Sequence, residues 1–314
     1  MSAMLHPVAH ANGDGGGPIP ARRRVSRRRA PAEGANPTVR QRELGTQLRD
    51  LRLERGMTVE EVAAEVLFSA TKLSRLENAT RPANPRDVRE LCRVYGVADP
   101  AGLMDLAELS REPGWWSRFD DLGQRIEPLI GLEQVAVAIT SYSMYYVPPL
   151  LQTEDYARAV IRGISRRMDP RVVNERVEAR MLRQRRFDGV GRPRYRALAD
   201  EAVLRRELGG SAVMRGQLDK ILTFVTDDLG SVQIIPFGAG AHASSDSNFD
   251  LLEFGEDTGQ VPVVYVEGLV GNHILERPAE LARYREAIEY LREIALSTQD
   301  SADMISEVRD SYSN

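Results

Sequence analysis

The sequence contains little lysine, cysteine or aromatic residue, and it has no long apolar run. Only two of its 42 basic residues are lysines, so arginine carries almost all of the positive charge. The single cysteine, Cys92, excludes an internal disulfide framework and suits a reducing compartment. No segment approaches the roughly 18 apolar residues that a membrane-spanning helix requires. We therefore expect a soluble, cytoplasmic protein with no membrane partner.

Recognisable patterns for catalysis and metal binding are also missing. The four histidines do not occur in an H-E-x-x-H arrangement, and no nucleophile motif joins Ser, His and Asp. We expect no catalytic residues, no cofactor and no metal site.

The length and composition favour more than one domain. A chain of 314 residues with 42% apolar content can form two packed cores. The pattern changes from short helices to mixed strands and longer helices after Arg111. We predict a disordered basic arm over residues 1–37 that contains RRRVSRRR, an all-α five-helix domain over 38–110, an α+β domain over 111–298 and a tail over 299–314.

The segment from Thr58 to Asn78 predicts two short amphipathic helices joined by a tight turn. Thr58 and Glu61 form a T-x-x-E capping box at the start of the first helix. Ser69 is a good N-cap for the second helix, whose apolar residues Leu73 and Leu76 have the spacing of one buried face. The opposite face carries small, hydroxyl and basic side chains, which suit entry into a DNA major groove. An ordinary pair of packed helices is the alternative.

Two motifs give this region a family likeness. The run LRLERGMT from Leu51 and the pattern S-x-x-x-L-S-R-L-E-N from Ser69 resemble the Cro/CI-type (XRE) helix-turn-helix domain of bacterial repressors. The resemblance makes the second helix the recognition helix and pairs Arg52 with Glu77. It implies a surface for double-stranded DNA at Thr58, Ser69, Ala70, Thr71, Lys72, Ser74, Arg75, Asn78 and Arg81. Of these, Ala70, Thr71 and Arg75 resemble base readers, and Lys72 and Asn78 resemble phosphate contacts.

The sequence departs from this family at two positions. Val59 replaces the glutamine that often opens the first helix of the motif, so one phosphate contact is expected to be lost. Ala79 replaces the glycine that usually follows Glu-Asn. We expect mild strain at Ala79 if its backbone is left-handed.

The second part alternates strand and helix patterns. We predict strands at Val135–Tyr142, Val232–Ile235, Phe249–Phe254 and Val261–Val266. We predict a helix at Val172–Phe187 and a second helix with Ser211 as its N-cap. A third helix begins at Pro278, with an apolar stripe of Leu281, Tyr284, Ile288 and Leu291. This order favours helices packed on a largely antiparallel sheet.

A series of motifs in this part carries a second resemblance. They include GWW from Gly114, GLE from Gly131, VPPLLQTEDYARAV from Val147, EARMLRQRRF from Glu178 and VVYVEG from Val263. They are similar to the C-terminal DUF5753 domain of Scr1-type antitoxin-like regulators of actinobacteria. Pro149 stands where that family usually has glycine. The resemblance implies a very small DUF397-like protein as a partner.

Six polar residues of this part form a candidate site for an effector or partner. They are Arg180, Gln184, Glu201, Arg205, His242 and Glu267. His242 follows a Gly-Ala-Gly turn, which could present an imidazole or backbone amides to a ligand. The alternative is that His242 makes a single loop hydrogen bond and that Glu201 pairs with a nearby arginine.

Three functions follow from these patterns. The first is a sequence-specific transcriptional regulator whose C-terminal domain binds a partner or effector. The second is an antitoxin that mainly sequesters a small toxin, and the third is an enzyme fused to a DNA-binding domain. One recognition helix covers too few base pairs for a unique site, so we expect a homodimer, with the helix from Pro278 as its contact.

Overall fold

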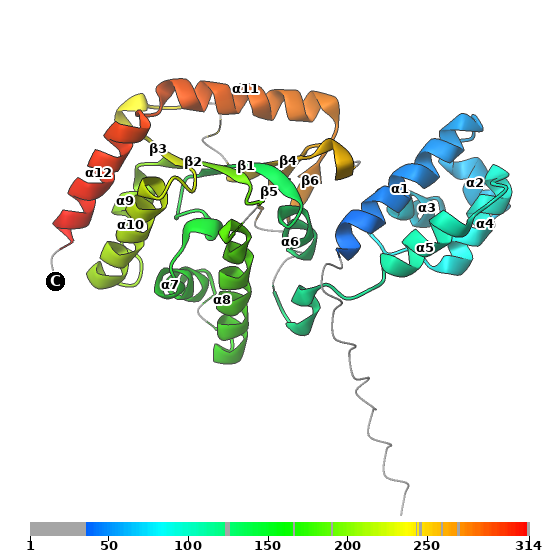
Figure 1. Ribbon diagram of the computed structural model, residues 1–314, viewed down its shortest axis with the longest axis horizontal. Coiled ribbons are helices and arrows are strands. Elements are labelled where there is room, and N and C mark those ends of the chain that lie inside the picture. Colours follow the sequence, from blue (N-terminus) through cyan, green and yellow to red (C-terminus); the bar gives the residue numbers. More distant parts are fainter. Residues whose placement is uncertain are drawn as a thin grey trace, which may run out of the picture.

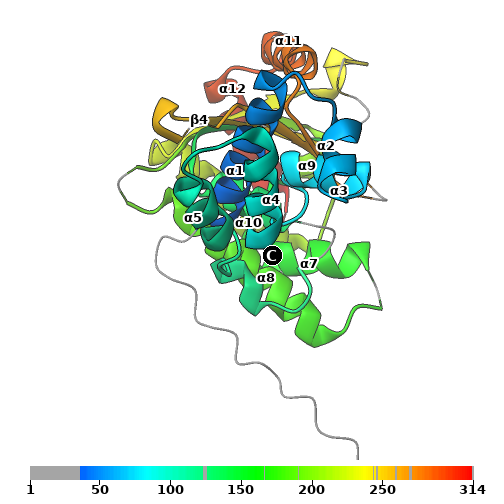
Figure 2. The same ribbon diagram turned by 90° about the vertical axis from the view of Figure 1, so that its right-hand side faces the viewer.

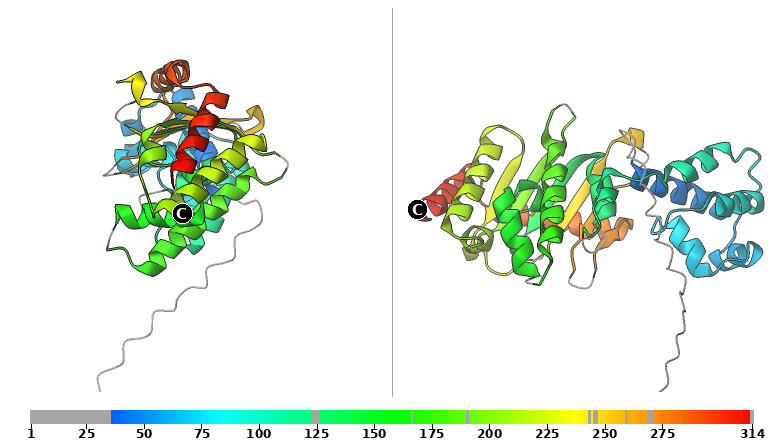
Figure 3. Two further views of the ribbon diagram at one scale, coloured as in Figure 1. Left: turned by 90° about the vertical axis from the view of Figure 1, so that its left-hand side faces the viewer. Right: turned by 90° about the horizontal axis from the view of Figure 1, so that it is seen from below.

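The computed structural model describes residues 36–312 except 123–125, 166, 190, 243, 245–246, 259 and 269–270. An N-terminal helical domain and a larger C-terminal α+β domain lie end to end (Figures 1 and 3). Helix α12, Thr298–Ser311, lies at the far end from the helical domain. The basic arm was predicted over residues 1–37, and residues 1–35 of it lie outside the described part of the chain.

Five helices form the N-terminal domain, as predicted: α1 Pro37–Glu54, α2 Val59–Glu65, α3 Ala70–Glu77, α4 Pro85–Tyr95 and α5 Ala101–Leu109. Their apolar faces meet in one core, which includes Leu48, Val62, Leu73 and Leu91. In the view onto this domain in Figure 2, α2 and α3 lie together at one side, beside α1. The domain begins earlier than predicted, because the Asn36 side chain accepts a hydrogen bond from the Val39 amide and caps α1.

The described part of the C-terminal domain contains a sheet with the order β3-β2-β1-β4-β5-β6. Its strands are β1 Ala136–Ser143, β2 Arg194–Asp200, β3 Ser231–Ile235, β4 Phe249–Phe254, β5 Val263–Val266 and β6 His273–Leu275. The α+β class is confirmed. The prediction of a largely antiparallel sheet was wrong for one half, since β1, β2 and β3 are parallel. Helical crossovers connect these three strands, and such crossovers are what parallel neighbours need.

Helices cover both faces of the sheet (Figure 1). One face packs against α11 Pro278–Ile294, and residues such as Leu198, Leu251 and Val264 point toward it. The other face carries α6 Glu127–Glu133, α7 Glu154–Ile164, α8 Pro170–Gln184, α9 Ala202–Arg205 and α10 Ser211–Thr226. Gly210 rather than Ser211 is the N-cap of α10.

Helix α11, which was predicted as the dimer contact, packs against the sheet of its own chain. Leu281, Ile288 and Leu291 form the apolar stripe that suggested this helix, and all three are buried against the chain's own sheet. That stripe is therefore not available to a second copy.

The predicted tail at 299–314 was wrong, because the chain forms a further helix, α12 Thr298–Ser311. Ile305 and Val308 of α12 join the main core beside α10. Ser301 Oγ accepts a hydrogen bond from the Ile234 amide at 2.9 Å, and the Leu296 amide donates to the Ile234 carbonyl at 2.8 Å. The C-terminal segment thus closes the exposed edge of β3. Short 3-10 helices occupy Trp115–Arg118, Pro149–Leu151, Arg185–Phe187, Phe237–Ala239 and Glu256–Thr258.

Candidate DNA-binding interface and candidate ligand site

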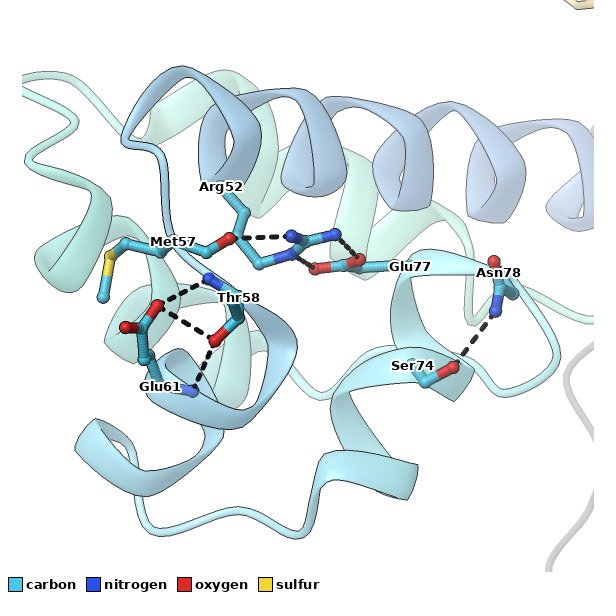
Figure 4. A network of polar contacts seen from close by, with 7 residues as sticks. All are labelled: Arg52, Met57, Thr58, Glu61, Ser74, Glu77 and Asn78. Atoms are coloured by element: carbon cyan, nitrogen blue, oxygen red, sulfur yellow. Dashed lines mark hydrogen bonds and ion pairs between the residues drawn. The ribbon is translucent and has the colours of Figure 1, made fainter.

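Side-chain caps fix the ends of the two helices that form the helix-turn-helix. Thr58 Oγ1 accepts from the Glu61 amide at 3.2 Å, and Glu61 Oε2 accepts from the Thr58 amide at 2.8 Å (Figure 4). Ser69 Oγ accepts from the Lys72 amide at 3.1 Å and caps α3. The predicted start of each helix therefore has its hydrogen-bonding partner in place.

An ion pair between Arg52 and Glu77 joins α1 to the end of α3. Arg52 donates from Nε and Nη2 to the two carboxylate oxygens, at 2.7 and 2.9 Å, and from Nη1 to the Met57 carbonyl at 2.9 Å (Figure 4). The two side chains are 9% and 4% exposed, so the pair is dry. The hydrogen bond to Glu77 raises the pKa of Arg52. This bidentate contact fixes the angle of α3 against α1.

A close backbone approach supports the same contact. A Cβ atom at Gly45 of α1 would lie 2.6 Å from the Glu77 carbonyl oxygen, so glycine permits α3 to end against α1. The residue after the α3 C-cap, Ala79, has the left-handed φ of 52° that its position suggested. Gln41 Nε2 donates to the Ala79 carbonyl at 2.5 Å and holds this turn.

The outer face of α3 and its surroundings are open to solvent. Among the residues expected on the DNA-binding surface, Ala70, Lys72 and Ser74 are half-buried, and the exposed ones are Thr58, Ser69, Thr71, Arg75, Asn78 and Arg81. The inner face buries Leu73 and Leu76 in the domain core. The helix therefore separates a fixed apolar side from an outer side that carries hydroxyl, amide and guanidinium groups.

Lys72 has partners inside the domain. Its Nζ lies 2.8 Å from Asp87 of α4 and 3.4 Å from the centre of the Phe68 ring. A phosphate that recruits Lys72 has to compete with the Asp87 carboxylate, a requirement that the sequence did not indicate.

The six residues of the predicted C-terminal site do not form one cluster. Glu201 pairs with Arg205 at 2.5 Å and accepts from the Phe237 amide, as the alternative for Glu201 supposed. His242 lies on the α11 side of the sheet, where its Nε2 is 3.4 Å from the Tyr142 hydroxyl. Arg180 and Gln184 lie instead on α8, which packs on the opposite face.

Gln184 has a structural role in the loop that precedes α7. Its Nε2 donates to the carbonyl groups of Pro149 and Gln152 at 2.9 and 2.8 Å. Lys220 of α10 donates to the Gln152 carbonyl at 2.8 Å and to Gln184 Oε1 at 2.5 Å. These bonds hold the main chain of the loop and leave the Gln152 side chain directed toward Arg180.

Arg180 lines a cavity of about 100 Å³ between α6, α7 and α8. The remaining lining residues are mostly aliphatic: Leu122, Ile126, Ile130, Ile161, Ile164, Arg176, Ala179 and Arg183. Burial, followed by the charge of Arg183, lowers the pKa of Arg180 to about 10, and the negative charge of Glu267 acts in the opposite direction. Of the six predicted residues, Arg180 and Glu267 are therefore close enough for the charge of Glu267 to affect the pKa of Arg180.

A buried polar network beside this cavity was not predicted. Arg183 donates from Nε and Nη2 to Glu133 of α6 at 2.8 and 2.6 Å, and the side chains are 4% and 5% exposed. Ser141 of β1 donates to Asp250 of β4 and accepts from the Tyr195 hydroxyl at 2.9 Å. Burial raises the pKa of Asp250 to about 7. Arg183 and Glu133 both stand in motifs that carry the family resemblance, which is the signal that could have paired them.

Within the described ranges, no three or more His, Cys, Asp or Glu side chains are grouped so as to hold a metal ion. None of the helices there combines the length and apolar character needed to cross a membrane.

Comparison with known families agrees with this architecture. A helix-turn-helix domain model matches residues 43–106, which defines the class of the chain as a DNA-binding regulator. A domain of unknown function, DUF5753, matches residues 126–307. Since that match covers more than half of the 314 residues, the chain belongs to the DUF5753 family. No curated protein and no solved structure matches the chain.

Proposed function

We propose that the protein is a sequence-specific transcriptional regulator that reads operator DNA with α3. The supporting observation is the division of α3 into two sides. Its inner side is fixed by the Arg52–Glu77 pair, while Thr71 and Arg75 stand exposed on its outer side. A rigid helix with an outward guanidinium fits the bidentate recognition of guanine in the major groove.

Two substitutions on α3 test this proposal. Selection from genomic DNA first supplies a binding sequence, and competition with random DNA then measures selectivity. Arg75→Ala should reduce the affinity for the selected sequence by about 1 to 3 kcal/mol and leave random DNA little changed. Thr71→Ala should relax selectivity at a neighbouring base pair. Arg285→Ala on α11, an exposed arginine of the other domain, is the control and should change neither. Equal loss on both DNAs for Arg75→Ala would remove it as a base reader.

We further propose that the protein binds DNA as a homodimer and that the C-terminal domain controls this binding. The helical domain buries most of its apolar residues in its own core, with Leu53 and Leu67 exposed, and one α3 is too short to specify a site in a genome. Half-sites should then lie about 10 base pairs apart or a multiple of that. Light scattering on the full chain, alone and on its selected DNA, checks the assembly. A monomer under both conditions would contradict the dimer.

The resemblance to Scr1-type regulators supports a very small DUF397-like protein as one ligand of the C-terminal domain. A partner of this kind would change DNA affinity without touching DNA. Co-purification of the full chain with such a protein encoded beside it, followed by DNA binding with and without it, tests this part of the proposal. A complex with unchanged DNA affinity would reduce the partner's role to sequestration, as in the antitoxin hypothesis.

A further inference from the structure

Three arginines line the cavity between α6, α7 and α8, and one of them, Arg180, has no ion pair among the described residues, while the charge of Glu267 acts on it from a longer distance. Arg183 pairs with Glu133, and Arg176 lies 3.0 Å from Asp121. Within the described part of the chain, the one hydrogen bond of Arg180 is from Nη1 to Gln152 Oε1 at 2.6 Å, and no carboxylate lies within ion-pair distance of it. A guanidinium has five N–H donors, so most of its capacity is available to a ligand.

The surroundings of Arg180 indicate the chemical class of the ligand. Burial disfavours the charged guanidinium and lowers its pKa, so an anion placed against it would regain the lost electrostatic stabilisation. The other wall of the cavity is formed by Ile126 and Ile130 from the α6 region and by Ile161 and Ile164 of α7. A ligand that satisfies both walls has an acidic group at one end and an aliphatic body at the other.

The volume limits the size of this ligand. A cavity of about 100 Å³ is smaller than an engineered apolar cavity of about 150 Å³ that accepts benzene. About six non-hydrogen atoms therefore fit, which corresponds to a branched carboxylate of four carbons. A nucleotide or a sugar phosphate exceeds this space and would extend out of it.

The same wall of the cavity also holds the DNA-binding domain. On α6, Ile130 lines the cavity, Glu133 binds Arg183, and Gly131 contacts the start of α1. Asn36 Nδ2 donates to the Gly131 carbonyl at 2.7 Å. A Cβ atom at Gly131 would overlap the Thr38 side chain of α1, so the side chain at the start of α1 packs directly on the α6 backbone. A small shift of α6 therefore changes where α1 rests.

We propose that this cavity binds a small aliphatic carboxylate, with its acidic group on Arg180 and its alkyl group on the isoleucines, and that occupancy alters the docking of α1 on α6. This inference rests on the proposed function, because it supplies the regulator with an effector. It extends that proposal by naming the chemical class of the effector and the helix that transmits its binding.

Calorimetric titration of the full chain tests the ligand class. The probes are isobutyrate, the uncharged isobutyramide and inorganic phosphate. Isobutyrate should bind at least about tenfold more tightly than the amide, because a charge-assisted bidentate contact is lost in the amide. Arg180→Gln should remove this preference, and Arg185→Gln, an exposed arginine on the next turn, should retain it. Equal binding of acid and amide, preference for phosphate, or no binding to the wild type would each overturn the inference.

DNA binding separates this inference from the proposed function. Isobutyrate should change the affinity of the wild-type chain for its selected DNA and should not affect Arg180→Gln. Gly131→Ala should still bind isobutyrate, but its DNA affinity should no longer respond. A chain that binds DNA selectively and ignores isobutyrate would refute the effector while the proposed function stands. A chain that binds isobutyrate and no DNA would refute the proposed function instead.

Discussion

Removing one partner of the Arg52–Glu77 pair should destabilise the helical domain strongly. The two side chains are 9% and 4% exposed, and the guanidinium makes three hydrogen bonds, two of them to Glu77. Glu77→Ala leaves a buried cation without its anion, and breaking such a pair costs about 3 to 5 kcal/mol. A wet surface pair would contribute under about 1 kcal/mol.

The size of this effect makes it measurable. For a domain of this length, each kcal/mol lowers the melting temperature by roughly 4 to 8 °C, so Glu77→Ala should lower it by more than about 12 °C. Hydrogen exchange of the α1 and α3 amides in the full chain isolates this domain from the larger one. Arg52→Ala tests the reverse case and should cost a similar amount, because it leaves the Glu77 carboxylate, which is 4% exposed, without its cation.

A matched double variant separates the charge effect from the loss of packing. Arg52→Met combined with Glu77→Leu keeps an apolar contact of similar volume and leaves no unpaired charge. It should recover most of the lost stability, since a buried pair and a well-packed apolar replacement are often equivalent. Unchanged exchange protection in Glu77→Ala would refute the view that this pair fixes α3.

Three further predictions concern strain, charge and pH. Ala79→Gly should stabilise the helical domain by up to about 1 kcal/mol in denaturant titrations, because φ is 52° there, whereas Ala64→Gly within α2 should destabilise it by about as much. A loss of stability in Ala79→Gly would mean that no strain is stored there. Asp87→Asn should release Lys72, strengthen binding to random DNA and steepen its salt dependence by up to about one unit; an unchanged slope would show that Lys72 does not reach phosphate. Asp250 binds a proton more tightly in the folded chain, with a pKa of about 7, than in the unfolded chain, so it should lower stability as pH rises from about 4 to 7. Asp250→Asn should flatten this decline by on the order of 1 kcal/mol per pH unit, and identical pH profiles of the two proteins would contradict the burial of that carboxyl group.

Local signals predicted the helical domain well. Thr58, Glu61 and Ser69 act within four residues of the helix ends that they cap, so the sequence contains the whole interaction. Strand β4 was predicted at its observed bounds because its apolar residues are bracketed by polar turns.

Long-range features of the larger domain were harder to predict. Strand β2 lies between two neighbours and reads RYRALAD, which lacks the clean alternation of a one-sided strand. Strand β6 is only three residues long. Helix α12 has few apolar residues, Ile305 and Val308 are its buried ones, and its polar composition suggested a tail. Parallel pairing depends on which helix crosses over the sheet, and strand patterns alone do not indicate this.

The candidate ligand site illustrates the same limit. Arg180 was selected from a motif, but the isoleucines around it come from two other helical segments, α6 and α7, and no spacing rule predicts that these meet α8. Glu201 and His242 were chosen by residue type, and both are engaged by neighbours on other elements. Residue chemistry identified candidates, and only the packing of the chain distinguished a ligand group from a structural one.

The closure of β3 by the last helix also determines when the larger domain can be completed. Ile234 exposes its amide and carbonyl at a sheet edge until Ser301 and Leu296 arrive, and an unpaired edge is a site for pairing with other chains. Domains fold in order from the amino end during synthesis. The helical domain can therefore fold before the residues that complete the sheet have been synthesised. A nascent or prematurely terminated chain would have a complete DNA-binding domain and no finished C-terminal domain to control it.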